Sequence, residues 1–337
     1  MTLMRFPKKE VKKAGIFRAL QLGDILCSIP AMRSLRAAYP NAKIYFIGLP
    51  DSEALIRRWP HYVDEFISFP GYPGLPEQSF DEENFYCFLP KIQAIKFDLI
   101  LQMQGNANAL NHLVKSFNAR YLAGFCKDNA DENDCFLTYP DFGTETQRQL
   151  SLMTHLGIPL SGDELEFPLF PADYQHLEQL RLPIEPGAYV CIHPGSKGSW
   201  KQWPSIYFAC IANYCTDLGF KVLLTGSLNE LHLAQHVADL MKTKPIICAG
   251  KTTLGSLAVL ISQAAAVISN ATEISQIAAA VDTPSMMISM DKEPFRWGRS
   301  DQHLNRIIDW SSNPDFRIVH QEVVSLFEEL QLFHKSV

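Results

Sequence analysis

Short apolar stretches typical of buried strands alternate with longer amphipathic stretches along most of this chain. In the first half the apolar stretches are Gly15–Leu20, Lys43–Gly48, Phe97–Met103 and Ala119–Phe125. Between the first two, residues 24–39 carry apolar side chains at three- and four-residue steps, which predicts a helix that ends at Pro40. Strands that alternate with helices in this way form a parallel sheet with helices on both faces.

A proline-rich segment divides the chain. Residues 159–187 contain five prolines, and we predict a linker over 166–187 that includes one short helix. The alternation then restarts, with strands expected at 189–193, 221–225, 245–248, 266–269 and 285–289, and helices at 204–218, 229–241, 254–264, 272–280 and 319–330. The sequence therefore predicts an α/β protein with two Rossmann-like, doubly wound domains, 1–165 and 188–337. Because ligands bind beyond the carboxyl ends of such strands, we expect the two domains to face each other across a cleft.

Charge and cysteine content indicate which partners and which cellular compartment to expect. The 337 residues carry a net charge of -6, which argues against nucleic acid, since phosphate backbones need a basic face. None of the eight cysteines forms a CxxC pair, so they are typical of a reducing compartment. The basic N-terminus lacks the apolar core of a signal peptide, and no run approaches the ~18 apolar residues of a spanning helix. We expect a cytoplasmic protein whose contact with a membrane is peripheral.

The turn after the first expected strand carries Gly23 and Asp24. The glycine lets the chain turn tightly from the strand into the helix, so Asp24 lies near the helix N-terminus. One interpretation of Asp24 is an N-cap, a position that aspartate often fills. The other is a catalytic base that takes a proton from an attacking hydroxyl group.

The segment 194–204, PGSKGSWKQWP, joins a strand to a helix in the second half. It offers glycines, serine hydroxyls and lysines just before a helix N-terminus. Free backbone N–H groups, the helix dipole and ammonium groups together favour a bound anion. Ser196, Lys197 and Lys201 are therefore candidate phosphate ligands, and the alternative is a solvated basic loop.

A third polar turn, residues 269–276 with the sequence SNATEISQ, links another strand to a helix. Its simplest interpretation is helix capping by Asn270 or Thr272.

Several cofactor and metal motifs are absent from the sequence. Pro245 stands where a P-loop ending at 249–253 would require its first glycine. His232 and His236 are four residues apart, but Leu233 replaces the glutamate of a zinc-protease helix. No GxGxxG follows the first strand, and no Asp-x-Asp occurs. We therefore expect neither a dinucleotide cofactor nor a metal.

Three segments, in this order and spacing, resemble the heptosyltransferase family. LGDILCSIPAMRSLRAAYPNAKIYFIG (22–48) is the most specific, and FDLILQMQGNANAL (97–110) and HPGSKGSWKQWP (193–204) add to it. The resemblance covers nearly the whole chain and implies the two-domain GT-B fold. It also implies inverting, metal-independent transfer of a heptose or related sugar from a nucleotide-diphosphate donor, ADP-heptose. The implied acceptor is a lipid-linked, lipopolysaccharide-type glycan met at the inner membrane face.

The resemblance implies roles for particular residues. Asp24 matches the family's catalytic base, and Lys201 matches the lysine that contacts the donor phosphates. The remaining donor-side positions are Ser196 and Lys197 in the same loop, Glu230 at the ribose hydroxyls, Thr252 beside the adenine, and Thr272, Glu273 and Gln276 in the third turn. Gln104 and Asn106 are candidates on the acceptor side.

One segment departs from the family pattern. The family carries Asp-Thr/Ser-Gly-x-x-His where this chain has ATEISQ (271–276). A glutamate at 273 repels a diphosphate unless it points away or pairs with Lys197 or Lys201. Two alternatives to the transferase therefore remain: a non-catalytic module that binds nucleotide or glycan, and a sugar-nucleotide epimerase.

Overall fold

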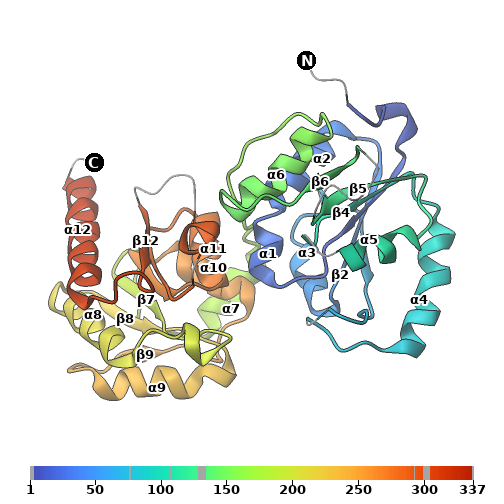
Figure 1. The fold of residues 1–337 in the computed structure, drawn as a ribbon. Helices are drawn as coiled ribbons and strands as arrows, with labels where there is room; N and C mark the ends of the chain where they lie inside the picture. The colour runs from blue at the N-terminus through green and yellow to red at the C-terminus, as the bar shows by residue number, and fades with distance from the viewer. Residues whose placement is uncertain are drawn as a thin grey trace. The chain divides into compact units, whose positions relative to one another are not determined.

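The computed structural model of the protein describes residues 4–75, 77–105, 108–127, 134–291, 293–298 and 304–335. The chain separates into two compact units, residues 1–165 and 166–337 (Figure 1). Each unit has its own parallel sheet, as the alternation of strands and helices predicts. No helix within the described ranges is long and apolar enough to cross a membrane.

The sheet of the first unit has six parallel strands. They are β1 (Lys13–Phe17), β2 (Lys43–Gly48), β3 (Glu65–Ser68), β4 (Leu99–Gln102), β5 (Tyr121–Cys126) and β6 (Phe136–Thr138). Their order is β3-β2-β1-β4-β5-β6, which is the doubly wound order. The chain reverses its direction of travel across the sheet between β1 and β4, and ligands of this fold bind at the carboxyl ends of the strands at that switch point.

Helices of the first unit connect these strands. They are α1 (Leu22–Leu26), α2 (Ile29–Ala38), α3 (Glu53–Ile56), α4 (Glu82–Ile95), α5 (Asn108–Lys115) and α6 (Glu145–His155), with short 3-10 turns at Lys8–Glu10 and Pro50–Ser52. The single helix predicted over 24–39 is wrong, because it is interrupted between α1 and α2. Pro30 lies in the first turn of α2 and has no N–H to donate to the preceding turn. The helix therefore restarts there.

The second unit repeats the same plan. Its strands are β7 (Tyr189–His193), β8 (Lys221–Leu224), β9 (Ile246–Ile247), β10 (Ala266–Asn270), β11 (Ser285–Ser289) and β12 (Asn305–Asp309). The order β12-β11-β10-β7-β8-β9 places the switch point between β7 and β10. The edge strand β12 was not expected from the sequence, because its polar, half-buried residues lack the apolar run that marks the central strands.

The helices of the second unit include one in the segment predicted to be a linker. They are α7 (Pro171–Gln179), α8 (Ser205–Asp217), α9 (Leu231–Leu240), α10 (Leu254–Ser262), α11 (Glu273–Ala280) and α12 (Phe316–Lys335), with 3-10 turns at Ser199–Lys201, Leu228–Glu230 and Pro294–Trp297. Helix α7 packs on α10, where His176 Nδ1 lies 3.0 Å from Ser256 Oγ. Helix α8 packs beside α9 and α12, and Trp203 at the entry to α8 is buried in this core.

Candidate active site

Asp24 lies in the first turn of α1, at the carboxyl edge of the sheet beside β1. Gln21 occupies the N-cap position of this helix, so the N-cap interpretation of Asp24 is wrong. The Asp24 side chain is 22% exposed. A partly exposed carboxylate at the switch point of the sheet is placed to accept a proton from a bound hydroxyl group.

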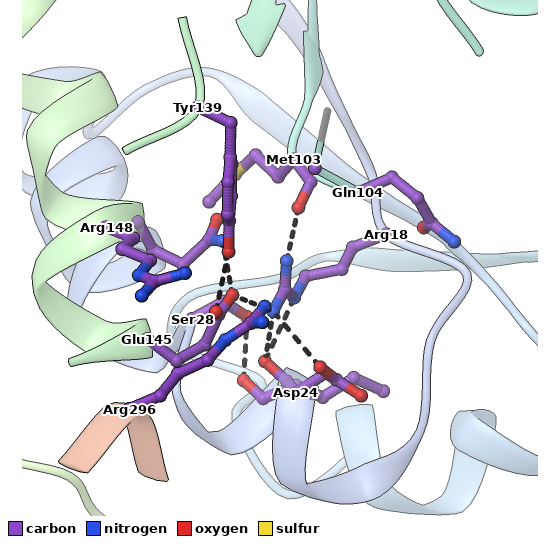
Figure 2. A network of polar contacts seen from close by, with 12 residues as sticks. Arg18, Asp24, Ser28, Met103, Gln104, Tyr139, Glu145, Arg148 and Arg296 are labelled. Atoms are coloured by element: carbon purple, nitrogen blue, oxygen red, sulfur yellow. Dashed lines mark hydrogen bonds and ion pairs between the residues drawn. The ribbon is translucent and has the colours of Figure 1, made fainter. Parts of the chain in front are cut away.

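Arg18, directly after β1, is fully buried and contacts the residue that carries this carboxylate. Its Nε and Nη2 donate to the backbone oxygen of Asp24 at 2.9 and 2.8 Å. Its Nη1 donates to the backbone oxygen of Met103, directly after β4. Figure 2 shows these contacts converging on one guanidinium group. Arg18 therefore links the two loops that flank the switch point.

Glu145, the first residue of α6, supplies a counter-charge for Arg18. Its Oε1 accepts bonds from Arg18 Nη2 at 3.1 Å and from Gln149 Nε2 at 2.8 Å, and its Oε2 accepts one from the Tyr139 hydroxyl at 2.6 Å. A buried carboxylate is stable only when it is paired and hydrogen-bonded, and these three donors meet that need. Sequence reasoning missed Arg18 because it lies inside an apolar run, and it missed Glu145 and Tyr139 because no local pattern links them to Asp24.

Gln104 holds the loop after β1 from the other side. Its Oε1 accepts a bond from the Ala19 N–H at 2.6 Å, and its Nε2 donates to the Ala19 oxygen at 3.0 Å. The amide group is thus engaged with the backbone beside the switch point, and its contact with an acceptor stays a prediction. Asn106 lies outside the described residues.

Cys27 lies one turn after Asp24 and is buried. Burial, together with the negative charges of Glu145 and Asp24, raises the pKa of its thiol to about 12. The thiol therefore stays protonated near neutral pH, and it is not a nucleophile at this site.

The loop that joins β7 to α8 in the second unit is held by the buried side chain of Asn270, the last residue of β10. Asn270 Nδ2 donates to the backbone oxygens of Pro194 at 2.8 Å and Gly195 at 3.1 Å. Its Oδ1 accepts a bond from the Trp203 N–H at 2.9 Å. Asn270 thus fixes both ends of the loop, and its interpretation as a simple helix cap is wrong.

We expect Asn270→Ala to destabilise the second unit by about 2–4 kcal/mol, because each buried partner left unsatisfied costs about 1–3 kcal/mol. Urea unfolding followed by tryptophan fluorescence measures this change. Asn213→Ala is the control, since its side chain accepts a bond from an exposed N–H, that of Lys242. Equal stability of the two variants would contradict the bracing role of Asn270.

Lys201 lies in the 3-10 turn of this loop, and its ammonium group already has an anionic partner. Its Nζ is 2.7 Å from Asp291 Oδ2 and lies 4.8 Å from the ring centre of Trp200. Lys197 is exposed, whereas Ser196 is buried and its backbone oxygen accepts a bond from Gln202. The structure thus gathers the predicted loop residues beside β7, and it adds Asp291, whose charge the sequence did not connect with Lys201.

The Glu230 side chain packs against Gly195 of the same loop. Its Oε2 accepts bonds from the N–H and the hydroxyl of Ser227, both at 2.8 Å. A side chain at Gly195 would place its Cβ 2.2 Å from Glu230 Oε1, so glycine leaves room for this carboxylate. Thr252 lies farther along, in the turn before Thr253, which caps α10.

The residues of the divergent segment 271–276, between β10 and α11, differ in burial and in their contacts. Thr272 takes the N-cap position of α11, Glu273 is exposed in the first turn, and Gln276 is buried. Gln276 Nε2 donates to the backbone oxygen of Trp297 at 3.1 Å. Of the two acidic residues Glu273 and Asp291, Lys201 pairs with Asp291 in the part of the chain that the structure describes.

His193, at the carboxyl end of β7, is a buried residue of this region that the sequence did not single out. Its Nδ1 lies 3.2 Å from Thr225 Oγ1. Burial lowers the pKa of the imidazole, against the raising effect of the carboxylates of Glu230 and Glu273. Among the described residues, no group of three or more His, Cys, Asp or Glu side chains is arranged to hold a metal ion.

Comparison with known proteins places this chain in a family. Residues 88–322 match glycosyltransferase family 9 (heptosyltransferase). Lipopolysaccharide heptosyltransferase 3 of Escherichia coli is 26% identical over 287 residues, which cover 82% of each chain. The crystal structure of a family 9 glycosyl transferase from Veillonella parvula has a TM-score of 0.77 at 19% identity, and it covers 95% of this chain and 97% of its own. The E. coli heptosyltransferase WaaC with ADP has a TM-score of 0.61 at 19% identity over 87% and 89% of the two chains.

These findings confirm the expected fold, with two Rossmann-like domains as in the solved heptosyltransferases. They also confirm the expected enzyme class and favour a transferase over an epimerase or a binding module. The chain belongs to glycosyltransferase family 9, the heptosyltransferases.

Proposed function

We propose that this protein transfers a heptose or related sugar from ADP-heptose to a lipopolysaccharide-type glycan, with inversion and without a metal ion. The observation that carries the proposal is the partly exposed Asp24 carboxylate at the switch point of the first sheet, beside the buried Arg18. The relatives support the choice of substrates, because one is named a lipopolysaccharide heptosyltransferase and another was solved with ADP.

The chemistry assigns one task to each unit. Asp24 takes the proton of the acceptor hydroxyl, and the oxygen forms a bond to the anomeric carbon of the donor sugar. The bond from that carbon to the phosphate oxygen breaks on the opposite face, and ADP leaves with the electron pair. Lys201 and the N–H groups at the start of α11 stabilise the charge that grows on the leaving phosphate.

We assign the donor contacts to the loops after β7, β8, β9 and β10. Ser196, Lys197, Lys201 and Thr272 face the diphosphate, Glu230 binds the ribose hydroxyls, and Thr252 lies beside the adenine. Glu273 and Gln276 replace the family's glycine and histidine at the sugar end of this site. On the acceptor side, we assign Gln104 and Asn106 to contacts with a lipid-linked glycan that the enzyme meets peripherally at the inner membrane, from the cytoplasm.

Calorimetric titration with ADP, ADP-heptose, UDP and GDP, in buffer containing EDTA, tests the donor. We expect the two adenine ligands to bind and the other two to bind more weakly. A preference for UDP or GDP would replace ADP-heptose as the donor. Binding of ADP-heptose without ADP release in the presence of deacylated lipopolysaccharide would instead favour a non-catalytic module, for which the altered 271–276 segment is the specific reason.

A further inference from the structure

We propose that Arg18 and Glu145 are positioning residues for Asp24: their buried ion pair fixes the start of α1 and gives the guanidinium group its direct hydrogen-bonded partner, so that its ion pair with the carboxylate of the base is the longer one. This inference rests on the proposed role of Asp24. Arg18, Glu145 and Asp24, which Figure 2 shows together, all belong to the first unit.

Helix α1 is too short to hold Asp24 in place through its own hydrogen bonds. It spans five residues, Leu22–Leu26, and the Gln21 side chain makes no capping bond within the described part of the chain. Isolated helices of this length are unstable in water. The two bonds from Arg18 to the Asp24 backbone oxygen supply a restraint from outside the helix, at the residue that carries the base.

The positive charge of Arg18 is shared unequally between two carboxylates. A buried guanidinium needs an anionic partner, and two carboxylates lie within reach of Arg18 Nη2: Glu145 at 3.1 Å and Asp24 at 4.0 Å. Bonds from Tyr139 and Gln149 aim Glu145 at the arginine, so Glu145 makes the direct hydrogen bond. Arg18 therefore makes its direct hydrogen bond to Glu145 and a longer ion pair, at 4.0 Å, to the Asp24 carboxylate.

Two further groups of the first unit lie close to this network, Arg148 and Cys27. Arg148 of α6 lies 5.7 Å from the Tyr139 ring centre and donates to the backbone oxygens of Asp141 and Gly143. The Cys27 thiol is protonated, because burial raises its pKa. When the negative charge of Glu145 is removed, the positive charge of Arg18 acts more strongly on the Asp24 carboxylate. Asp24 then holds a proton less tightly and is a weaker base.

Glu145→Gln is the main test, because glutamine keeps the size of the side chain and removes its charge. We expect kcat to fall about 10- to 100-fold, since small misplacements of a catalytic group reach that size. The KM for ADP-heptose should stay unchanged, and the acid limb of the kcat–pH profile should move to lower pH. Arg18→Lys keeps the charge but cannot form the same set of bonds, and we expect a similar loss of kcat.

Three further variants separate positioning from folding. Arg36 and Asp64 form a more exposed ion pair at the amino edge of the same sheet, where Arg36 donates to Asp64 at 2.6 Å and to the Ala42 and Tyr62 oxygens. Arg36→Lys and Asp64→Asn should lower the melting temperature without changing kcat. If Glu145→Gln does not fold, Tyr139→Phe removes only the hydroxyl that aims Glu145, and kcat should still fall about 3- to 10-fold.

The outcomes distinguish this inference from the function on which it rests. Wild-type kcat and an unshifted pH profile in a folded Glu145→Gln or Tyr139→Phe variant would overturn the positioning role, provided that Asp24→Asn is inactive. Wild-type turnover in Asp24→Asn would overturn the proposed role of Asp24 itself. A lower kcat in the Arg36 and Asp64 variants, equal to that in Glu145→Gln, would also overturn the inference, because any destabilised sheet would then produce it.

Discussion

Replacing Asp24 with asparagine should lower kcat about 100- to 10,000-fold, the range that general-base catalysis contributes. Asparagine keeps the size of the side chain and the backbone oxygen that Arg18 binds, so the loop geometry is retained. The affinity for ADP should not change, because the proposed diphosphate ligands lie in the second unit. Initial rates of ADP release with ADP-heptose and deacylated lipopolysaccharide measure the loss.

Asp98→Asn is the matched control for this variant. Asp98 Oδ2 accepts bonds from the N–H groups of Lys12 and Lys13 at the amino end of the same sheet. Its substitution should affect stability and leave turnover intact. Turnover at the wild-type level in Asp24→Asn would show that another group takes the proton.

Replacing Lys201 with alanine should weaken ADP binding about 10- to 100-fold, because a hydrogen bond to a charged group contributes about 1.5–3 kcal/mol. The loss has a second cause, since Asp291 would lose its partner at 2.7 Å and repel the diphosphate. Isothermal titration calorimetry with ADP gives the change directly. Unchanged affinity would remove Lys201 from the donor site.

Asp291→Asn should change ADP affinity in the opposite direction to Lys201→Ala. The pair is partly exposed, with Lys201 32% and Asp291 16% accessible, so the interaction is worth about 1 kcal/mol or less. Freeing Lys201 from this pair should strengthen ADP binding about 2- to 5-fold. Weaker binding would mean that Asp291 orients Lys201 toward the phosphates.

The sequence alone determined the class of fold and the two positions at which chemistry is expected. The strands 43–48, 189–193 and 285–289 were predicted at their observed bounds, because a strand buried on both faces requires an unbroken apolar run. Asp24 and Lys201 were predicted as site residues from the family resemblance and for a related reason, and their roles stay predictions. The residues just after such strands lie at the carboxyl edge of the sheet, where ligands of doubly wound folds bind.

Local pattern was insufficient where an element is half-buried or interrupted. The edge strand β12 lacks an apolar run. The helix predicted over 24–39 is interrupted and begins again at Ile29, next to Pro30, because proline lacks the N–H that continues a helix. Periodicity alone reports which face of an element is buried. It does not report where a polar edge strand pairs or where a backbone bond is missing.

Only the tertiary structure decided which side chains act together. Arg18 meets Glu145 across 127 positions of sequence, Asn270 meets Trp203 across 67, and Lys201 meets Asp291 across 90. These pairs form because the fold of each unit brings together segments that follow different strands: β1 and β6 for the first pair, β7 and β10 for the second, and β7 and β11 for the third. The order of strands depends on how whole elements pack together. It therefore cannot be predicted from the residues that neighbour Arg18, Asn270 or Lys201 in sequence.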